Sequence, residues 1–262
     1  MDKAPLYAFF GSERLLVFAH DYEAGSIQHW HRHDVPQLLH AARGVMRVTT
    51  PDGYWVIPPG RGVWIPAFMP HEVRMVGSVF MRTLYVGCAL DPELAAECAI
   101  VDVPPLLLHL LEQLAGAEPP PPEQRARHRT IEDLVLIEIE QLERLRLHIP
   151  LPANTRLRKI CDEILASPEN GGTLEDLAEA AGASARTLRR LFQQELGMSF
   201  AAWRQQARLV EALARLGEGQ PIAVVSRELG YAAPSAFTAM FKRVIGKPPR
   251  SYQASRRLTA SK

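Results

Sequence analysis

The chain has 262 residues, of which 47% are hydrophobic and 23% are charged, and its formal net charge is +1. These values are ordinary for globular proteins and exclude a wholly disordered chain, and the length is sufficient for two domains. The sequence has no apolar run near the ~18 residues that span a bilayer and no secretion-signal pattern at its start, so we expect a cytoplasmic protein without membrane contact.

The small net charge hides an asymmetry between the two parts of the chain. From residue 154 onward there are 17 Lys and Arg against 10 Asp and Glu, a net of +7, so the first 153 residues carry 13 against 19, a net of −6. This asymmetry favours a polyanion as the partner of the C-terminal part. The cysteines Cys88, Cys98 and Cys161 lack the paired spacing of a zinc knuckle or a disulfide framework, so we expect reduced thiols.

Residues 13–90 consist of short β-branched segments separated by turns that contain Gly and Pro. The segments with the clearest strand pattern are 44–50, 54–57, 62–66, 71–75 and 80–86. Short strands at this spacing are typical of an antiparallel sandwich or barrel.

Polar residues within these strands have a spacing that resembles the two motifs of the cupin fold. The motifs read Gly25-x5-His31-x-His33-x3-Gln37-x6-Gly44 and Gly60-x5-Pro66-x-Phe68-x2-His71. Cupins are small β-barrels that present two His, a Glu and a third His into the lumen. The resemblance implies that His31, His33, Gln37 and His71 converge, although Gln37 replaces the usual Glu and Phe68 stands where Gly is common. On a strand His31 and His33 share one face, because they are two residues apart.

Three neutral imidazoles and an amide oxygen suit a divalent transition metal such as zinc, nickel, iron or manganese. No organic cofactor is implied. Two other interpretations remain open, namely a metal-free pocket whose histidines hydrogen-bond a small ligand, and structural histidines without any ligand. Four side chains are candidates either for the lining of a ligand pocket or for ordinary barrel core: Trp55, Trp64, Met81 and Arg82.

After residue 90 the pattern changes from strands to helices. We predict a short apolar helix over 104–115, a proline-rich joint over 117–122 and one long helix over 123–145. The apolar side chains of the long helix recur at three- and four-residue steps: Ile131, Leu134, Val135, Ile137, Leu142 and Leu145. This stripe either dimerises the protein or packs back onto the barrel, and the pattern leaves both open. Residues 148–154 contain two prolines and are predicted as a linker.

Residues 173–196 have the pattern of a helix-turn-helix unit. Thr173 and Asp176 form a capping box at the start of one helix, Gly182 permits a tight turn, and Ser184 caps the next helix. The polar face of that second helix carries Arg186, Arg189, Arg190 and Gln193. Arginine side chains in such a context match guanine in the major groove and also bind phosphates.

The same pattern recurs over residues 221–245, after a connecting helix predicted over 200–216. Gly230 ends the first helix of this second unit, and the second helix begins at Ser235. Its outward-facing residues are predicted to be Ser235, Ala236, Thr238, Ala239, Lys242 and Arg243.

Residues 155–253 resemble the DNA-binding domain of the AraC/XylS family of bacterial transcription regulators. The resemblance is carried by Thr173-Leu174-Glu175-Asp176-Leu177-Ala178, Ser184-x-x-x-Leu188-x-Arg190-x-Phe192, Gly197-x-Ser199-Phe200, Arg208, Leu229-Gly230-Tyr231, Phe237, Phe241-Lys242 and Gly246-x-Pro248-Pro249. In such regulators the second helix of each unit enters the major groove of double-stranded DNA. The small side chains of Ala236 and Ala239 depart from the polar residues that many members carry. We therefore expect the first recognition helix to read most bases and the second chiefly to fix the position, with Lys242 and Arg243 toward phosphates.

The sequence thus predicts an α+β multidomain protein with a cupin-like sensing domain (1–100), a helical dimerisation and linker segment (101–153) and an all-α domain of two helix-turn-helix units (154–262). We expect a homodimeric transcription regulator, activator or repressor, that responds to a metal or a small molecule and is not an enzyme. The alternative from another class is a metal-dependent cupin enzyme, of the dioxygenase or isomerase type, that carries a DNA-binding domain. A third possibility is an architectural DNA binder with a vestigial barrel.

Overall fold

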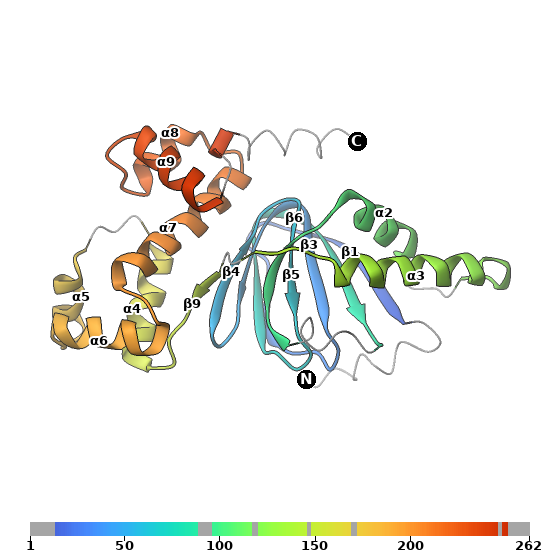
Figure 1. The fold of residues 1–262 in the computed structure, drawn as a ribbon, viewed down its shortest axis with the longest axis horizontal. Helices are drawn as coiled ribbons and strands as arrows, with labels where there is room; N and C mark the ends of the chain where they lie inside the picture. Colours follow the sequence, from blue (N-terminus) through green and yellow to red (C-terminus); the bar gives the residue numbers. More distant parts are fainter. Residues whose placement is uncertain are drawn as a thin grey trace. The chain divides into compact units, whose positions relative to one another are not determined.

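The computed structural model describes residues 14–88, 96–116, 120–145, 148–168, 172–245 and 248–250. The chain divides into two compact units, one drawn from residues 1–48 and 57–147 and the other from 49–56 and 148–262. The first unit is a β-sheet with two helices, and the second is mainly helical (Figure 1), so the predicted α+β multidomain class is confirmed. The division lies at 147/148, a few residues before the predicted start of the third segment, and the segment 49–56 joins the helical unit.

The first unit is built on antiparallel strand pairs. Its strands are β1 (Leu15–Tyr22), β2 (Ile27–His31), β3 (Gln37–Thr49), β5 (Arg61–Ile65), β6 (His71–Val86), β7 (Ala99–Asp102) and β8 (Arg144–Leu145). They follow the order β1-β6-β3-β5-β7-β8, and β2 pairs with β6. The segments predicted at 71–75 and 80–86 are one 16-residue strand, which pairs with β2 along one part and with β1 along the other.

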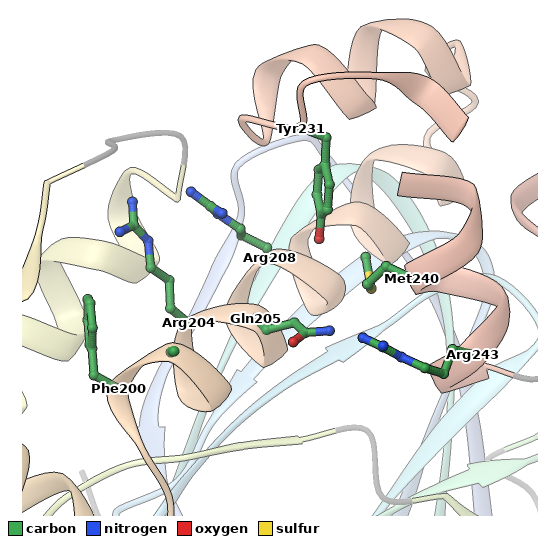
Figure 2. Close-up of a pocket in the computed structure, with 8 residues that line it drawn as sticks. Phe200, Arg204, Gln205, Arg208, Tyr231, Met240 and Arg243 are labelled. Carbon is green, nitrogen blue, oxygen red and sulfur yellow. The ribbon is translucent and has the colours of Figure 1, made fainter. Parts of the chain in front are cut away.

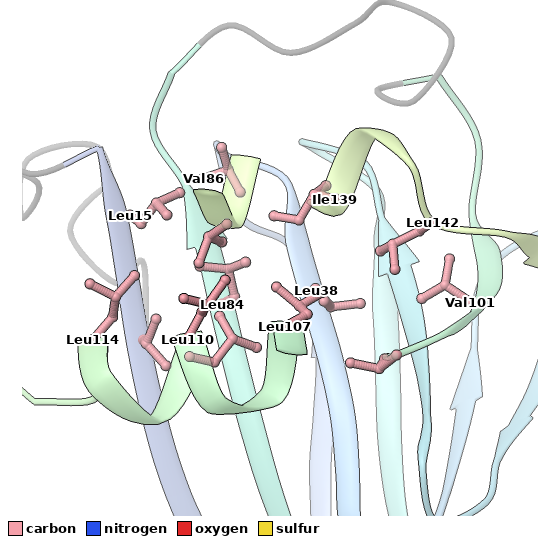
Figure 3. Close-up of a cluster of buried hydrophobic side chains, with 14 of the residues drawn as sticks. Leu15, Leu38, Leu84, Val86, Val101, Leu107, Leu110, Leu114, Ile139 and Leu142 are labelled. Carbon is pink, nitrogen blue, oxygen red and sulfur yellow. The ribbon is translucent and has the colours of Figure 1, made fainter. Parts of the chain in front are cut away.

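Two helices cover one face of this sheet, α2 (Pro105–Leu114) and α3 (Arg125–Glu140). Figure 3 shows the hydrophobic cluster between them and the strands. The cluster contains Leu15, Val17, Leu38, Trp64, Leu84, Val86 and Val101 from the strands, Val103 just after β7, Leu107, Leu110, Leu111, Leu114, Ile131, Val135 and Ile139 from the two helices, and Leu142 just after α3. Part of the apolar stripe predicted along 123–145 therefore packs onto the protein's own sheet.

The predicted long helix ends earlier than the sequence pattern indicated. After α3 ends at Glu140, the amide of Leu142 donates to the carbonyl of Ile139, and Leu145 pairs with Ile100 in an antiparallel ladder of β7 and β8. The prediction was wrong over 141–145, because pairing with β7 replaces the helical hydrogen bonds there.

The second unit contains the helices α4 (Thr155–Ala166), α5 (Leu174–Ala180), α6 (Ala185–Leu196), α7 (Phe200–Gly217), α8 (Ile222–Glu228) and α9 (Pro234–Ile245). Thr173 and Asp176 form the predicted capping box, the turn residue Gly182 has φ 61°, and the Ser184 side chain accepts from the Thr187 amide. Within the described residues, no helix is both long enough and apolar enough to cross a membrane.

The predicted linker begins with a strand. β9 (His148–Pro150) pairs with β4 (Gly53–Ile57), with Tyr54 opposite Ile149. The Leu151 amide donates to the Asp52 carbonyl at 2.8 Å, and the indole of Trp203 in α7 donates to the Pro150 carbonyl at 2.8 Å. These hydrogen bonds use backbone groups that a free linker would leave to water.

Candidate functional site

Three histidine rings meet where β2 ends and β6 begins. His31 lies directly opposite His71 in the ladder, and their ring centroids are 4.3 Å apart. His33 follows just after β2, with its ring 4.9 Å from His31 and 5.5 Å from His71. One ligand nitrogen from each ring lies within 4.8 Å of the others. Nitrogen ligands around one zinc lie ~3.4 Å apart, so the triad closes on a single ion with a shift of about 1 Å.

Backbone carbonyls orient two of these rings. His31 Nδ1 lies 2.6 Å from the carbonyl oxygen of His29, and His71 Nδ1 lies 2.9 Å from that of Met69. A carbonyl only accepts, so each Nδ1 carries the proton, and Nε2 keeps its lone pair. In metal-binding histidines the ring nitrogen that does not bind the metal commonly donates to such an acceptor, which fixes the orientation of the ring.

His71 and Gln37 each present a buried acceptor atom without a partner. His71 Nε2 and Gln37 Oε1 are shielded from solvent, and neither has a hydrogen-bond partner among the described residues. Burial is the main cause that lowers the pKa of His71 to about 4, so its imidazole is neutral near pH 7. Unsatisfied buried acceptors are costly, and a bound cation or hydrogen-bond donor removes that cost. The donor set therefore fits a divalent metal.

Gln37 and two of the histidines line one cavity of about 510 Å³. The other lining residues are Phe18, Ala19, His20, Tyr22, Gln28, His29, Met81, Thr83 and Tyr85. None of these described residues is Asp, Glu, Lys or Arg. Burial raises the pKa of Tyr85 to about 12, so its phenol remains a donor. Three of the four residues implied by the cupin resemblance thus line a neutral, partly aromatic cavity, and His71 adjoins it through its contacts with His31 and His33.

The four predicted pocket residues have different positions. Met81 lines the cavity, whereas Trp64 lies in the hydrophobic cluster beneath α2 and α3. Arg82 forms a 2.6 Å ion pair with Glu112 of α2. Trp55 belongs to the second unit, where its ring stacks on His148 at 4.5 Å.

Sequence reasoning missed Thr83 and Tyr85 as lining residues. Both share a face of β6 with Met81, since alternate residues of a strand point the same way. The same alternation sends Arg82 to the opposite face, so Met81 and Arg82 were not compatible as neighbours in one pocket. The period-two signal in the sequence was sufficient to identify Thr83 and Tyr85.

The predicted DNA-reading residues of the first helix-turn-helix lie on the exposed face of α6. Arg186, Arg189, Arg190 and Gln193 are exposed, whereas Leu188 and Phe192 are buried. Arg189 forms a 2.6 Å ion pair with Glu175 of α5, and Arg190 donates to Gln194 Oε1 at 3.0 Å. Ser184 is occupied as the helix cap.

The second helix-turn-helix presents a less basic surface, on α9. Its exposed residues include Ser235, Ala236, Ala239, Lys242 and Arg243, and Thr238 is half-buried. Phe237, Met240 and Phe241 are buried on the opposite face. The two helices offer unequal sets of side chains to a partner, with three arginines on α6 and one arginine and one lysine on α9.

Comparison with known proteins assigns both parts of the chain. A family model described as an AraC-like ligand binding domain matches residues 16–201, and a helix-turn-helix domain model matches residues 177–255. The HTH-type transcriptional regulator NimR of Escherichia coli is 30% identical over 224 residues, which cover 86% of this chain and 81% of NimR. The HTH-type transcriptional regulator RipA of Corynebacterium glutamicum is 37% identical over 103 residues, which cover 39% of this chain and 31% of RipA. The arabinose operon regulatory protein of Escherichia coli is 29% identical over 126 residues, which cover 47% of this chain and 42% of that protein.

Proposed function

This chain belongs to the AraC family of transcription regulators, with a ligand-binding domain and a DNA-binding helix-turn-helix domain, and from that premise we propose that its ligand is a divalent transition metal ion. It is a regulator and not an enzyme, since that family is one of transcription regulators. The proposed ligands of the ion are His31, His33 and His71, with Gln37 as a fourth donor. The observation that carries this proposal is the pair of buried, unpartnered acceptors, His71 Nε2 and Gln37 Oε1.

The donor set narrows the class of metal. Among the four candidate metals, zinc, nickel and iron suit neutral imidazoles best, and an amide oxygen adds a weak neutral ligand. None of the four donors is a carboxylate, so the site compensates no positive charge of the ion. We therefore expect weaker binding than at a site with a carboxylate ligand, and an ion that exchanges, as a sensor requires.

The cavity beside the triad favours a second candidate ligand, a small uncharged molecule. Its volume of about 510 Å³ lies within the range of small-molecule pockets, and its lining offers Tyr22, Gln28, Thr83 and Tyr85 for hydrogen bonds. Such a molecule either completes the coordination of the ion or takes the place of the ion at the histidines. In both cases, replacement of the three histidines should abolish the response to the ligand. The metal content of the protein distinguishes the two cases.

The metal proposal is tested by the metal content of the full-length protein after dialysis against zinc, nickel, iron or manganese. We expect one ion per chain in the wild type, and none in His71→Ala or in the His31→Ala, His33→Ala double variant. His20→Ala is the matched control, because His20 lines the same cavity outside the triad. Metal content in the double variant equal to that of the wild type contradicts the proposed ligands, and an absence of metal from the wild type favours the organic ligand.

We also propose that the regulator is a homodimer formed through the outer face of α3. Leu134 and Ile137 are 41% and 48% exposed on this helix, whereas Ile131, Val135 and Ile139 pack inward. The first five residues of α3 include three arginines, at 125, 127 and 129, and the C-terminal half carries three carboxylates, at 133, 138 and 140. An antiparallel second copy therefore places unlike charges opposite each other around the apolar stripe, as a two-fold interface requires.

The oligomeric state in solution tests this face directly. We expect Ile137→Asp to give monomers under conditions in which the wild type sediments as a dimer. Val244→Asp is the control, since Val244 is an apolar residue of the helical unit with a similar exposure of 46%. A dimer that survives Ile137→Asp with unchanged affinity rules out the α3 interface.

A further inference from the structure

A second cavity in the helical unit is lined by three arginines. It has a volume of about 470 Å³ and lies between α7 and α9 (Figure 2). Arg204, Gln205 and Arg208 come from α7, and Tyr231 and Arg243 come from the second helix-turn-helix unit. Phe200, Ala201 and Met240 complete its wall. We call it the three-arginine pocket.

The positive charge of this pocket has no counterpart among the residues that line it. No carboxylate is among its described lining residues, and no hydrogen bond or ion pair to Arg208 or Arg243 occurs among the described residues. Arg208 Nε is shielded from solvent and has no hydrogen-bond partner there. Burial, together with the charge of Arg208, lowers the pKa of Arg204. Arg208 and Arg243 thus bring two positive charges to a cavity whose described lining has no carboxylate, and such a cavity suits an anion.

Neutral donors and a planar surface complete the site. The hydroxyl of Tyr231 and the amide of Gln205 face the same cavity as the guanidinium groups. Burial raises the pKa of Tyr231, so its hydroxyl keeps the proton that it donates. The guanidinium of Arg204 lies 5.8 Å from the centroid of the Phe200 ring, which supports its orientation. This combination of arginine forks and neutral donors suits the oxygens of a phosphate.

We propose that the three-arginine pocket binds a phosphate of the DNA backbone, in the stretch that separates the two major-groove segments entered by α6 and α9. The inference rests on the DNA-binding function of the helix-turn-helix domain and on the DNA-reading roles predicted from the sequence for these two helices. It adds a contact that neither recognition helix supplies alone, because Arg204 and Arg208 belong to the connecting helix.

The position of the pocket along the chain supports this source of phosphate. α7 begins at Phe200, four residues after α6 ends, and Phe200 packs on Phe192 of α6 with centroids 5.3 Å apart. Arg243 approaches from α9 on the other side. Arg204 also donates to the carbonyl of Gly172 at 2.8 Å, directly before α5, which is the helix of the unit that crosses the DNA backbone in helix-turn-helix proteins.

The salt dependence of DNA binding by the full-length protein tests this proposal. Each phosphate contact contributes about 0.9 to the slope of log K against log salt concentration. We therefore expect Arg243→Gln and Arg204→Gln each to lower the slope by up to about 0.9, and to weaken binding by the same factor on a specific site and on unrelated DNA. Arg204→Lys keeps the charge and should keep most of the slope. Lys159→Gln is the control, since it removes one exposed charge from α4, outside the pocket.

The result that overturns the proposal is a wild-type slope in both glutamine variants. The pocket could receive the same phosphate group from a free phosphorylated effector, and a binding test with inorganic phosphate distinguishes this ligand from DNA. If phosphate raises the melting temperature of the DNA-free wild type but not of Arg243→Gln, while the DNA slopes are equal, the pocket serves a free anion and the DNA proposal fails. A failed metal response leaves this test unaffected, because it uses only DNA binding by the wild type as its reference.

Discussion

Replacement of Arg190 by alanine is expected to remove a base contact from the first recognition helix. The side chain is exposed on α6, and its 3.0 Å hydrogen bond to the uncharged Gln194 is worth only about 0.2–0.5 kcal/mol. Arg190 therefore loses little when it leaves Gln194 to contact DNA. A bidentate arginine–guanine pair is worth about 1–3 kcal/mol of discrimination. Arg190→Ala should therefore weaken specific binding by about 1–3 kcal/mol, or about 5- to 150-fold.

The neighbouring Arg189 gives an internal comparison. Its ion pair with Glu175 joins two exposed side chains, 63% and 60% accessible, and such pairs contribute about 0–1 kcal/mol. To reach a base Arg189 must first leave this carboxylate. We therefore expect Arg189→Ala to cost less affinity than Arg190→Ala, and Glu175→Ala to raise the affinity slightly, by freeing Arg189.

The assay is fluorescence anisotropy with a site selected from random DNA, alongside an unrelated duplex of equal length. Arg190→Ala should lose affinity for the selected site and relax the preference at one base position, with little effect on unrelated DNA. Arg227→Ala, an exposed arginine on α8, controls for the loss of one charge. An unchanged base preference in Arg190→Ala refutes the assignment of α6 as the main base-reading helix.

Three further substitutions test the packing of the two units. Burial, with the charge of Arg82 as a smaller cause, holds the pKa of His40 at about 3, below its unfolded value near 6.5, so only the unfolded chain gains this proton as the pH falls from about 6.5 toward 3. Over this pH range His40 should lower the stability of the wild type by up to about 1.4 kcal/mol per pH unit. His40→Leu should therefore lose less stability than the wild type between pH 7 and pH 4.5, as measured by urea unfolding. An equal loss in both proteins contradicts this. Glu132→Ala removes the acceptor of the buried Leu15 amide and of the partly buried Arg14 amide, and should cost about 1–3 kcal/mol in the same assay. An unchanged stability contradicts the packing of α3 against β1. Trp203→Ala empties a fully buried site and should cost about 3–5 kcal/mol, seen as a lower midpoint of thermal unfolding.

The helices of the DNA-binding domain could be predicted from the sequence because their signals are local. The predicted limits of α6, 185 and 196, agree with the structure, since the Ser184 cap and the left-handed Gly197 fix both ends within a few residues. The capping box of Thr173 and the turn at Gly182 are equally local. Such signals depend only on neighbouring residues, so tertiary packing did not change them.

The positions of single side chains around the cavity were harder to predict. His71 meets His31 only through the pairing of β2 with β6, and spacing alone does not give that register. Trp64 and Trp55 lie elsewhere because helices far along the chain cover Trp64, and because β9 brings His148 against Trp55. The end of α3 was missed for the same reason, since Leu145 pairs with β7, more than forty residues earlier in the sequence.

The proposed role of the histidine triad is tested most directly by the DNA affinity of the full-length protein with and without bound metal. The protein is freed of metal, and its affinity for the selected site is measured before and after addition of zinc, nickel, iron or manganese. At least one of these ions should change the affinity of the wild type by a factor of about 5–150, as is typical of coupled binding sites. The same ion should leave the affinity of His71→Ala unchanged, and His20→Ala should respond like the wild type. An unchanged wild-type affinity with all four ions, or an equal response in His71→Ala, contradicts metal sensing by the triad.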